Sequence, residues 1–185
     1  MRITVEDSIL VNIDFQDKLI PHMFNADELK KKTIGLIKGI KALQVPMLTT
    51  QQYTRGLGFT DAEISAALGA ENPEELSFIE KSTFSCLDCD EFRTALEKSG
   101  KRNVIIAGIE GHVCVLQTIV DLKSAGYNPI PVLDCISSRK ETDYLNGIKR
   151  YTAENVTPTC FESILFELCR TSKNPVFKEI SSIVK

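Results

Sequence analysis

The segment at residues 108–114 (Gly-Ile-Glu-Gly-His-Val-Cys) is well suited to covalent chemistry. An apolar run ends at Gly108 and a helical pattern begins near Val113, so Cys114 falls in the first turn of a helix. The unpaired amides and the positive dipole end at that position favour a thiolate, so we expect the pKa of Cys114 to fall. The same amides could bind an oxyanion formed when sulfur attacks a carbonyl. A buried, inert cysteine under a strand-to-helix turn fits this segment equally well.

Two charged residues also follow predicted strands. Asp14 ends the apolar run at residues 8–14, and Lys81 follows the run Phe-Ile-Glu that ends at residue 80. A carboxylate directly after a buried strand is costly unless it is paired or hydrogen-bonded. Taken singly, Asp14 could be a helix cap and Lys81 a solvated surface group. Because the carboxyl ends of parallel strands share one edge of a sheet, the acid, the cation and the thiol are expected to meet there.

Apolar runs of strand length alternate along the chain with stretches of helical period. Strands are predicted at residues 8–14, 45–51, 77–80, 103–107, 128–133 and 156–159. Helices are predicted at residues 26–43, 61–68, 88–98, 113–125, 140–152 and 161–171. This alternation predicts one three-layer α/β/α domain over residues 1–185, with a mostly parallel, Rossmann-like six-stranded sheet and helices on both faces. Ligands of such sheets bind beyond the carboxyl ends of the strands, near the switch point in strand order.

The composition excludes several classes of protein. Hydrophobic residues make up 43% of the 185 residues and charged residues 25%, as in ordinary globular proteins and unlike disordered ones. The net charge of -3 gives no strong basic field, which argues against a nucleic-acid partner. No apolar run approaches the roughly 18–20 residues needed to span a bilayer. Since no signal-peptide pattern is found either, we expect a cytoplasmic protein without a membrane partner, although an organelle remains open.

The chain has six cysteines but neither the small size nor the export signal of a disulfide scaffold, so we expect reduced thiols, most of them packed as small apolar groups. Cys86 and Cys89 have the one ligand-like spacing. A zinc site would need further soft ligands, and His22 and His112 are the only histidines. Two thiols near a loop are therefore the better interpretation than a metal or redox pair.

At these motifs the chain resembles the isochorismatase-like cysteine hydrolases, and above all the isochorismatase-domain-containing proteins of unassigned substrate. The resemblance covers nearly the whole chain. It rests on residues 13–16 (Ile-Asp-Phe-Gln), 80–84 (Glu-Lys-Ser-Thr-Phe), 107–118 and 134–139, and residues 50–58 look like the second-strand segment of those proteins. Three ordered motifs with matching flanks are a much stronger signal than any one of them.

The resemblance implies a catalytic triad of Asp14, Lys81 and Cys114. Cys114 would be the nucleophile, Asp14 would exchange the thiol proton as general base and acid, and Lys81 would hold Asp14 and stabilise negative charge. The family also has a cis peptide four residues before the cysteine, which falls between Ile109 and Glu110. That turn would aim the backbone N–H groups of Glu110 and Cys114 into an oxyanion hole.

Two departures from well-known members bear on the substrate. Nicotinamidases of the superfamily hold a metal with an Asp and histidines after the second strand, whereas residues 49–53 here contain no histidine. We therefore expect no metal and no cofactor. True isochorismatases act on a vinyl ether and lack the cysteine, so a small carbonyl compound such as an amide or thioester is the better substrate. Gln51, Tyr53 and His112 are predicted to line its pocket, although His112 could equally be a hydrogen-bonded structural residue.

The leading hypothesis is a cofactor-independent cysteine hydrolase that acts on a small-molecule substrate through a covalent thioester at Cys114. The alternatives are a ribonuclease-type activity and a non-catalytic binding protein that retains the fold. The resemblance also implies a homo-oligomer, a dimer or larger. The apolar residues at 165–168 and the terminal Ile180, Ile183 and Val184 could cover such an interface or close the core of the chain.

Overall fold

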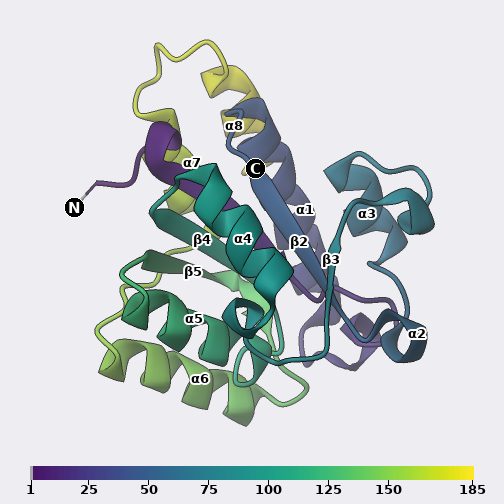
Figure 1. Cartoon of the computed structure of the whole chain (residues 1–185). Coiled ribbons are helices and arrows are strands. Elements are labelled where there is room, and N and C mark those ends of the chain that lie inside the picture. The colour runs from purple at the N-terminus through teal and green to yellow at the C-terminus, as the bar shows by residue number, and fades with distance from the viewer. Residues whose placement is uncertain (1) are drawn as a thin grey trace.

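The computed structural model describes residues 2–185, and its centre is a parallel sheet of five strands (Figure 1). The strands are β1 (Ser8–Ile13), β2 (Met47–Gln52), β3 (Ile79–Lys81), β4 (Asn103–Ile109) and β5 (Asn128–Ser137). Their order in the sheet is β3-β2-β1-β4-β5, and every neighbouring pair is parallel. The predicted α/β/α architecture is confirmed, and the order reverses between β1 and β4, which makes that junction the switch point.

The expectation of a sixth strand at residues 156–159 was wrong. This segment contributes a single isolated bridge, in which Thr159 pairs with Val132 on β5. The backbone amide of Thr159 donates to the Pro131 carbonyl, and the Thr159 carbonyl accepts from the Leu133 amide. Pro158 has no N–H to donate, so the ladder cannot extend through it as a regular strand. The segment covers the edge of β5 without becoming a sixth strand.

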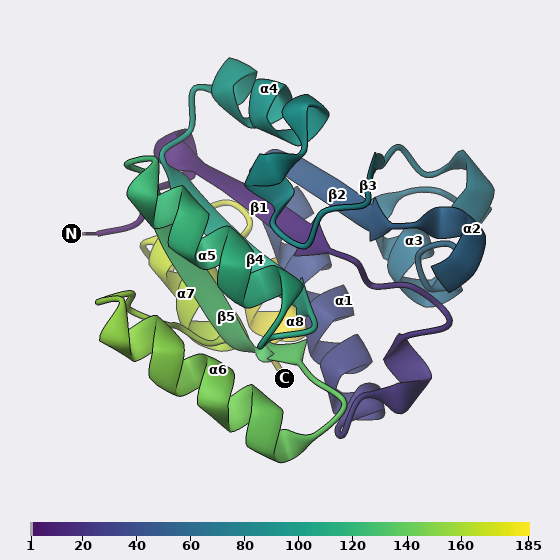
Figure 2. The same cartoon turned by 60° about the horizontal axis from the view of Figure 1, so that its bottom comes forward.

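Helices form a layer on each face of the sheet (Figure 2). One layer contains α1 (Ala26–Ala42), α3 (Ala62–Leu68), α7 (Phe161–Cys169) and α8 (Phe177–Ile183), and the other contains α4 (Asp90–Ser99), α5 (Cys114–Ser124) and α6 (Glu141–Ala153). The short helix α2 (Thr54–Leu57) follows β2, and 3-10 turns occupy Val5–Asp7, Ile20–His22, Pro73–Glu75 and Cys86–Asp88. None of the helices in residues 2–185 is both long enough and apolar enough to cross a membrane.

Each face of β1 contributes to a separate hydrophobic core, because alternate side chains of a strand point to opposite faces. Leu10 packs with the α1 layer, whereas Ile9 and Val11 pack with the α5 layer. The last helix, α8, has no counterpart among the predicted elements. Its Ile180 is fully buried in the α1 core, as is Leu165 of α7, so these apolar residues close the core of the chain itself.

Close contact between β1 and β4 fixes the geometry of the switch point. Ile13, the last residue of β1, is in register with Thr50 on one side and with Gly108 on the other. A Cβ atom at Gly108 would lie 2.7 Å from the Ile13 carbonyl oxygen and 2.5 Å from its Cβ, so only glycine fits there. The close approach brings the loop after β4 next to the residue that follows Ile13.

We expect Gly108→Ala to lower the free energy of unfolding by about 1–3 kcal/mol, because an overpacked core has to shift backbone atoms. Urea denaturation followed by circular dichroism measures this change. An unchanged midpoint would contradict the conclusion that β1 and β4 are in their closest possible contact at this residue.

Candidate active site

Asp14 lies directly after β1 and is 1% exposed. Its φ of 56° lies in the left-handed region, which aspartate tolerates better than most residues, and it turns the chain out of the strand. Its Oδ1 accepts a hydrogen bond of 2.7 Å from the Thr50 hydroxyl on β2, and its Oδ2 accepts one of 2.6 Å from Lys81 Nζ. A buried carboxylate needs such partners, and both come from the two strands beyond β1.

Lys81 is the last residue of β3, and its side chain is fully buried. Besides Asp14, its Nζ donates to Gln52 Oε1 at 2.7 Å and to the carbonyls of Thr83 and Phe84, both at 3.3 Å. Burial is the largest single effect on the pKa of Lys81 and lowers it, but the charge of Asp14, the nearby thiols and the hydrogen bond to Asp14 together outweigh it, and the net effect is a raised pKa. The site therefore contains a permanent buried ammonium group.

Cys114 is the first residue of α5 and is 7% exposed. Its pKa is raised to about 12, first by burial and then by the charge of Asp14, while Lys81 acts in the opposite direction. The expectation of a lowered pKa was wrong, since desolvation and the adjacent carboxylate outweigh the helix terminus. The thiol at rest therefore keeps its proton.

The turn between β4 and α5 carries two amides without partners. The Ile109–Glu110 peptide bond is cis. The Glu110 carbonyl accepts from the amides of Val113 and Val115, but in residues 2–185 the Glu110 amide itself donates to no backbone or side-chain acceptor. Cys114, as the first residue of its helix, has no intrahelical acceptor for its amide either. These are the two N–H groups that the sequence predicts for an oxyanion hole.

The three residues predicted to line a pocket lie in different surroundings. Tyr53 directly follows β2 and is 57% exposed, with its amide bound to the Lys81 carbonyl at 3.0 Å. His112 is partly buried, and its Nδ1 lies 2.9 Å from the Ser138 hydroxyl. Gln51 is fully buried and is bonded to the hydroxyls of Thr60 and Thr54, so the structure does not bring its side chain to Asp14.

Thr50 and Gln52, which contact the predicted triad, and Cys86, whose pKa its charges affect, were not assigned a role from the sequence. Thr50 and Gln52 lie two positions apart on β2 and bind Asp14 and Lys81 respectively. Cys86 is a fully buried thiol whose pKa is raised to about 12, by burial first and by Asp14 second. Strand periodicity could have found the first two, because side chains two residues apart share a face. Nothing local in the sequence distinguishes Cys86 from the other buried cysteines.

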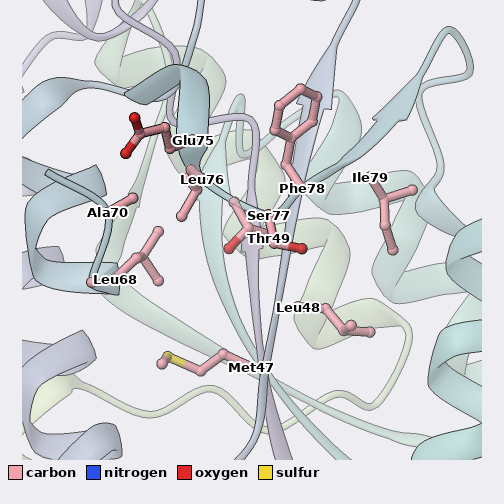
Figure 3. A pocket seen from close by; sticks show the side chains of 11 residues that line it. Met47, Leu48, Thr49, Leu68, Ala70, Glu75, Leu76, Ser77, Phe78 and Ile79 are labelled. Carbon is pink, nitrogen blue, oxygen red and sulfur yellow. The ribbon is translucent and has the colours of Figure 1, made fainter. Parts of the chain in front are cut away.

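A cavity of about 310 Å³ lies elsewhere, beside the amino half of β2. Figure 3 shows the side chains around it, which include Met47, Leu68, Leu76 and Phe78. Asp14, Lys81 and Cys114 are not among the residues that line it, so it lies outside the predicted site. Among residues 2–185, no three His, Cys, Asp or Glu side chains are grouped so that they could hold a metal ion.

A model of the isochorismatase domain matches residues 8–163, which are most of the chain. The chain belongs to the isochorismatase family. As expected for this family, the chain is similar to isochorismatase domain-containing protein 2A of Mus musculus, with 33% identity over 189 residues that cover all of this chain and 85% of that protein.

Solved structures show the same isochorismatase-like fold. The MAR1 ribonuclease from Caenorhabditis elegans has a TM-score of 0.90 and 33% identity, and the match covers all of this chain and 92% of that one. The YcaC gene product of Escherichia coli, described as an octameric hydrolase of unknown specificity, also has a TM-score of 0.90, but at 20% identity over 99% of this chain and 89% of that one. This second likeness supports the fold alone.

Asp14→Asn tests the arrangement without reference to any substrate. Removing the carboxylate charge leaves Lys81 as the dominant charge near the thiol, so the pKa of Cys114 should fall and its thiolate should form at lower pH. We therefore expect iodoacetamide to alkylate Cys114 several-fold faster in the variant than in the unaltered protein at pH 8.

The peptide of residues 103–123, which trypsin releases and which contains no other cysteine, reports the rate by mass spectrometry. The exposed Cys160 in the same digest is the internal control. Circular dichroism establishes that the variant folds, and Thr50→Val, which keeps the charge, should leave the rate nearly unchanged. A slower reaction of Cys114 in a folded Asp14→Asn protein would contradict the assigned electrostatics.

Proposed function

We propose that the protein is a cofactor-independent cysteine hydrolase that cleaves an amide-like C–N bond, or a related bond, of a small carbonyl compound. The observation that carries the proposal is that one buried carboxylate, Asp14, is bonded to the Lys81 ammonium and lies near enough to the Cys114 thiol for its charge to raise the pKa of that thiol. A thiol with a pKa of about 12 is a poor nucleophile by itself, so it needs a base in contact with it. Asp14 is that base.

The first half of the reaction forms a thioester. Cys114 Sγ attacks the carbonyl carbon while its proton moves to Asp14, and the carbonyl π electrons move to oxygen. The amides of Glu110 and Cys114 donate to this oxyanion. When the carbonyl re-forms, the C–N bond breaks and Asp14 returns the proton to the leaving nitrogen. Lys81 keeps the carboxylate in place throughout by charge and hydrogen bonding.

The second half restores the enzyme. Asp14 takes a proton from water as the water oxygen attacks the thioester carbon, and the same amides hold the new oxyanion. Its collapse breaks the C–S bond, the carboxylic acid leaves, and the sulfur regains the proton from Asp14. Every step uses groups of this chain together with substrate and water, so the cycle is balanced without a cofactor.

The substrate would bind on the carboxyl-end side of the sheet, next to Tyr53 and His112. Among residues 2–185, the large apolar side chains that are more than a third exposed are Phe24, Tyr53, Phe84 and Leu145. Tyr53 directly follows β2 and Phe84 lies three residues after β3, and Phe84 also presents its carbonyl to Lys81. Two exposed rings, on residues whose backbones hydrogen-bond to Lys81 of the buried ion pair, suit a compound whose carbonyl is attached to a hydrocarbon or ring.

Loss of the nucleophile should abolish turnover. In a panel of small amides and p-nitrophenyl esters, we expect Cys114→Ala to reduce kcat/KM at least about 10³-fold for any compound that is hydrolysed, since no other group can form the thioester. Cys160→Ala, which removes an exposed thiol, should retain full activity. Acid quenching during turnover should leave an acyl group on the peptide of residues 103–123. Equal activity of the two alanine variants would refute the proposal.

A ribonuclease activity is the second candidate, because a relative with 33% identity and the same fold is described as a ribonuclease. Asp14 could remove the proton from a ribose 2′-hydroxyl as a general base, a role that leaves the sulfur unused. The net charge of -3 opposes this candidate, since RNA binding depends on neutralising phosphates.

A labelled single-stranded RNA separates the two candidates. Under the hydrolase proposal we expect no cleavage above that of Asp14→Asn protein, in EDTA and at low salt, where phosphate contacts are strongest. Cleavage that survives Cys114→Ala but is lost in Asp14→Asn would favour the ribonuclease.

A homo-oligomer is proposed as the working form. Its support is the octameric state described for the Escherichia coli relative of the same fold. Leu165 and Ile180 are buried in the core of the chain, so an interface would have to use other surfaces.

A cytoplasmic location stays a prediction.

A further inference from the structure

Gln52 is the last residue of β2 and lies in register with Lys81 on β3. Its Oε1 accepts from Lys81 Nζ at 2.7 Å, and its Nε2 donates to the Ser82 carbonyl at 3.0 Å. An ammonium group can only donate and a carbonyl can only accept, so these two partners fix which end of the amide faces the lysine. The side-chain oxygen of Gln52 therefore faces the Lys81 ammonium.

Gln16, two residues after Asp14, holds Gln52 in this position. Its Oε1 accepts a hydrogen bond of 2.8 Å from the backbone N–H of Gln52. Its Nε2 donates to the backbone carbonyls of Gln52 at 3.0 Å and of Gly58 at 2.7 Å. Gln16 is fully buried. The two glutamines thus link the loop after β1 to the ends of β2 and β3, which carry the acid and the ammonium.

The Lys81 ammonium has three protons, and the chain supplies acceptors for all of them. The two shortest hydrogen bonds go to Asp14 at 2.6 Å and to Gln52 at 2.7 Å, and two carbonyls at 3.3 Å share the third proton. No proton of the ammonium is left over for a substrate. Lys81 consequently acts on the reaction through Asp14 and through its charge.

We propose that Gln52 is a positioning residue that retains the Lys81 ammonium whenever Asp14 becomes neutral. The inference rests on the proposed function, in which Asp14 accepts a proton in each half of the cycle. At those moments the buried ammonium loses the one anionic partner that residues 2–185 give it, which is costly for a charge without access to water. The dipole of Gln52, already in contact, offsets part of that cost and keeps Lys81 aligned until Asp14 is ionised again.

Two substitutions of Gln52 should act in opposite directions. Gln52→Met removes the acceptor, so Lys81 depends more on ionised Asp14, and Asp14 becomes a weaker proton acceptor. Gln52→Glu adds a second negative charge beside the ammonium, which makes Asp14 easier to protonate. Lys81, Cys114 and Cys86 are the titratable groups that interact with Asp14, and none of them is altered by either substitution.

The pH dependence of kcat/KM for a hydrolysed probe ester is the first measurement. We expect its acid limb to move to lower pH by about half a unit or more in Gln52→Met, with kcat reduced and KM nearly unchanged. In Gln52→Glu the acid limb should move to higher pH by a similar amount. Gln117→Met and Gln117→Glu, the same changes at an exposed position of α5, should move neither limb. Shifts of Gln52→Met and Gln52→Glu in the same direction, or no shift, would overturn the proposal.

Alkylation of Cys114 by iodoacetamide is the second measurement, and it needs no substrate. The added charge of Gln52→Glu counteracts the Lys81 cation that favours the thiolate, so labelling at pH 9 should slow about threefold or more. Gln117→Glu should change the rate less than twofold. If no probe is hydrolysed, the proposed function fails, but the alkylation rate of Cys114 still tests the role of Gln52. An unchanged alkylation rate in folded Gln52→Glu protein overturns that role. Gln52→Glu alone also decides if Gln52→Met does not fold.

Discussion

The ion pair between Asp14 and Lys81 is the interaction on which the rest of the site depends. Both side chains are almost completely withdrawn from water, and neither could be so without the other. Removing one partner of such a pair typically costs about 3–5 kcal/mol, because it leaves an uncompensated buried charge. The pair also spans β2, since the carboxylate follows β1 and the ammonium ends β3, so the carboxyl edge of the sheet must be intact for it to form. Near the end of β2, Thr50 donates a hydrogen bond to Asp14, and Gln52 accepts one from Lys81.

The electrostatics of the site explain why an acid is needed beside the sulfur. Many cysteine enzymes rely on a thiolate that is present before substrate arrives. Here burial and the charge of Asp14 both raise the pKa of Cys114, so under the proposed function the thiolate would be generated only during the attack. A resting thiol has a practical advantage: it is less exposed to oxidation and to unrelated electrophiles. The cost is strict dependence on the position of Asp14, which Lys81 and its acceptors maintain.

Much of the architecture and of the site could be predicted from the sequence, because β-α alternation implies a parallel sheet whose strand ends converge. Asp14, Lys81 and Cys114 were predicted from their positions after strands and from resemblance to a family, and their catalytic roles stay a prediction. Other features depend on tertiary contacts that local patterns do not encode. The sign of the Cys114 pKa shift is set by burial, the sixth strand fails at Pro158, and α8 is a helix because Ile180 completes a core. Gln51 was chosen over Gln52 since an isolated strand does not reveal which of its faces carries the lysine.

The shortness of β3 has a consequence for how this protein can change over evolution. Three residues of strand provide few backbone bonds to the edge of the sheet, whereas the side chain of its last residue makes four contacts with its surroundings. The hydrogen bonds of the Lys81 side chain thus help to hold β3 at the edge of the sheet. A protein that lost the chemistry during evolution could not replace Lys81 alone without destabilising β3. It would have to replace Asp14 and Lys81 together with apolar groups of similar volume.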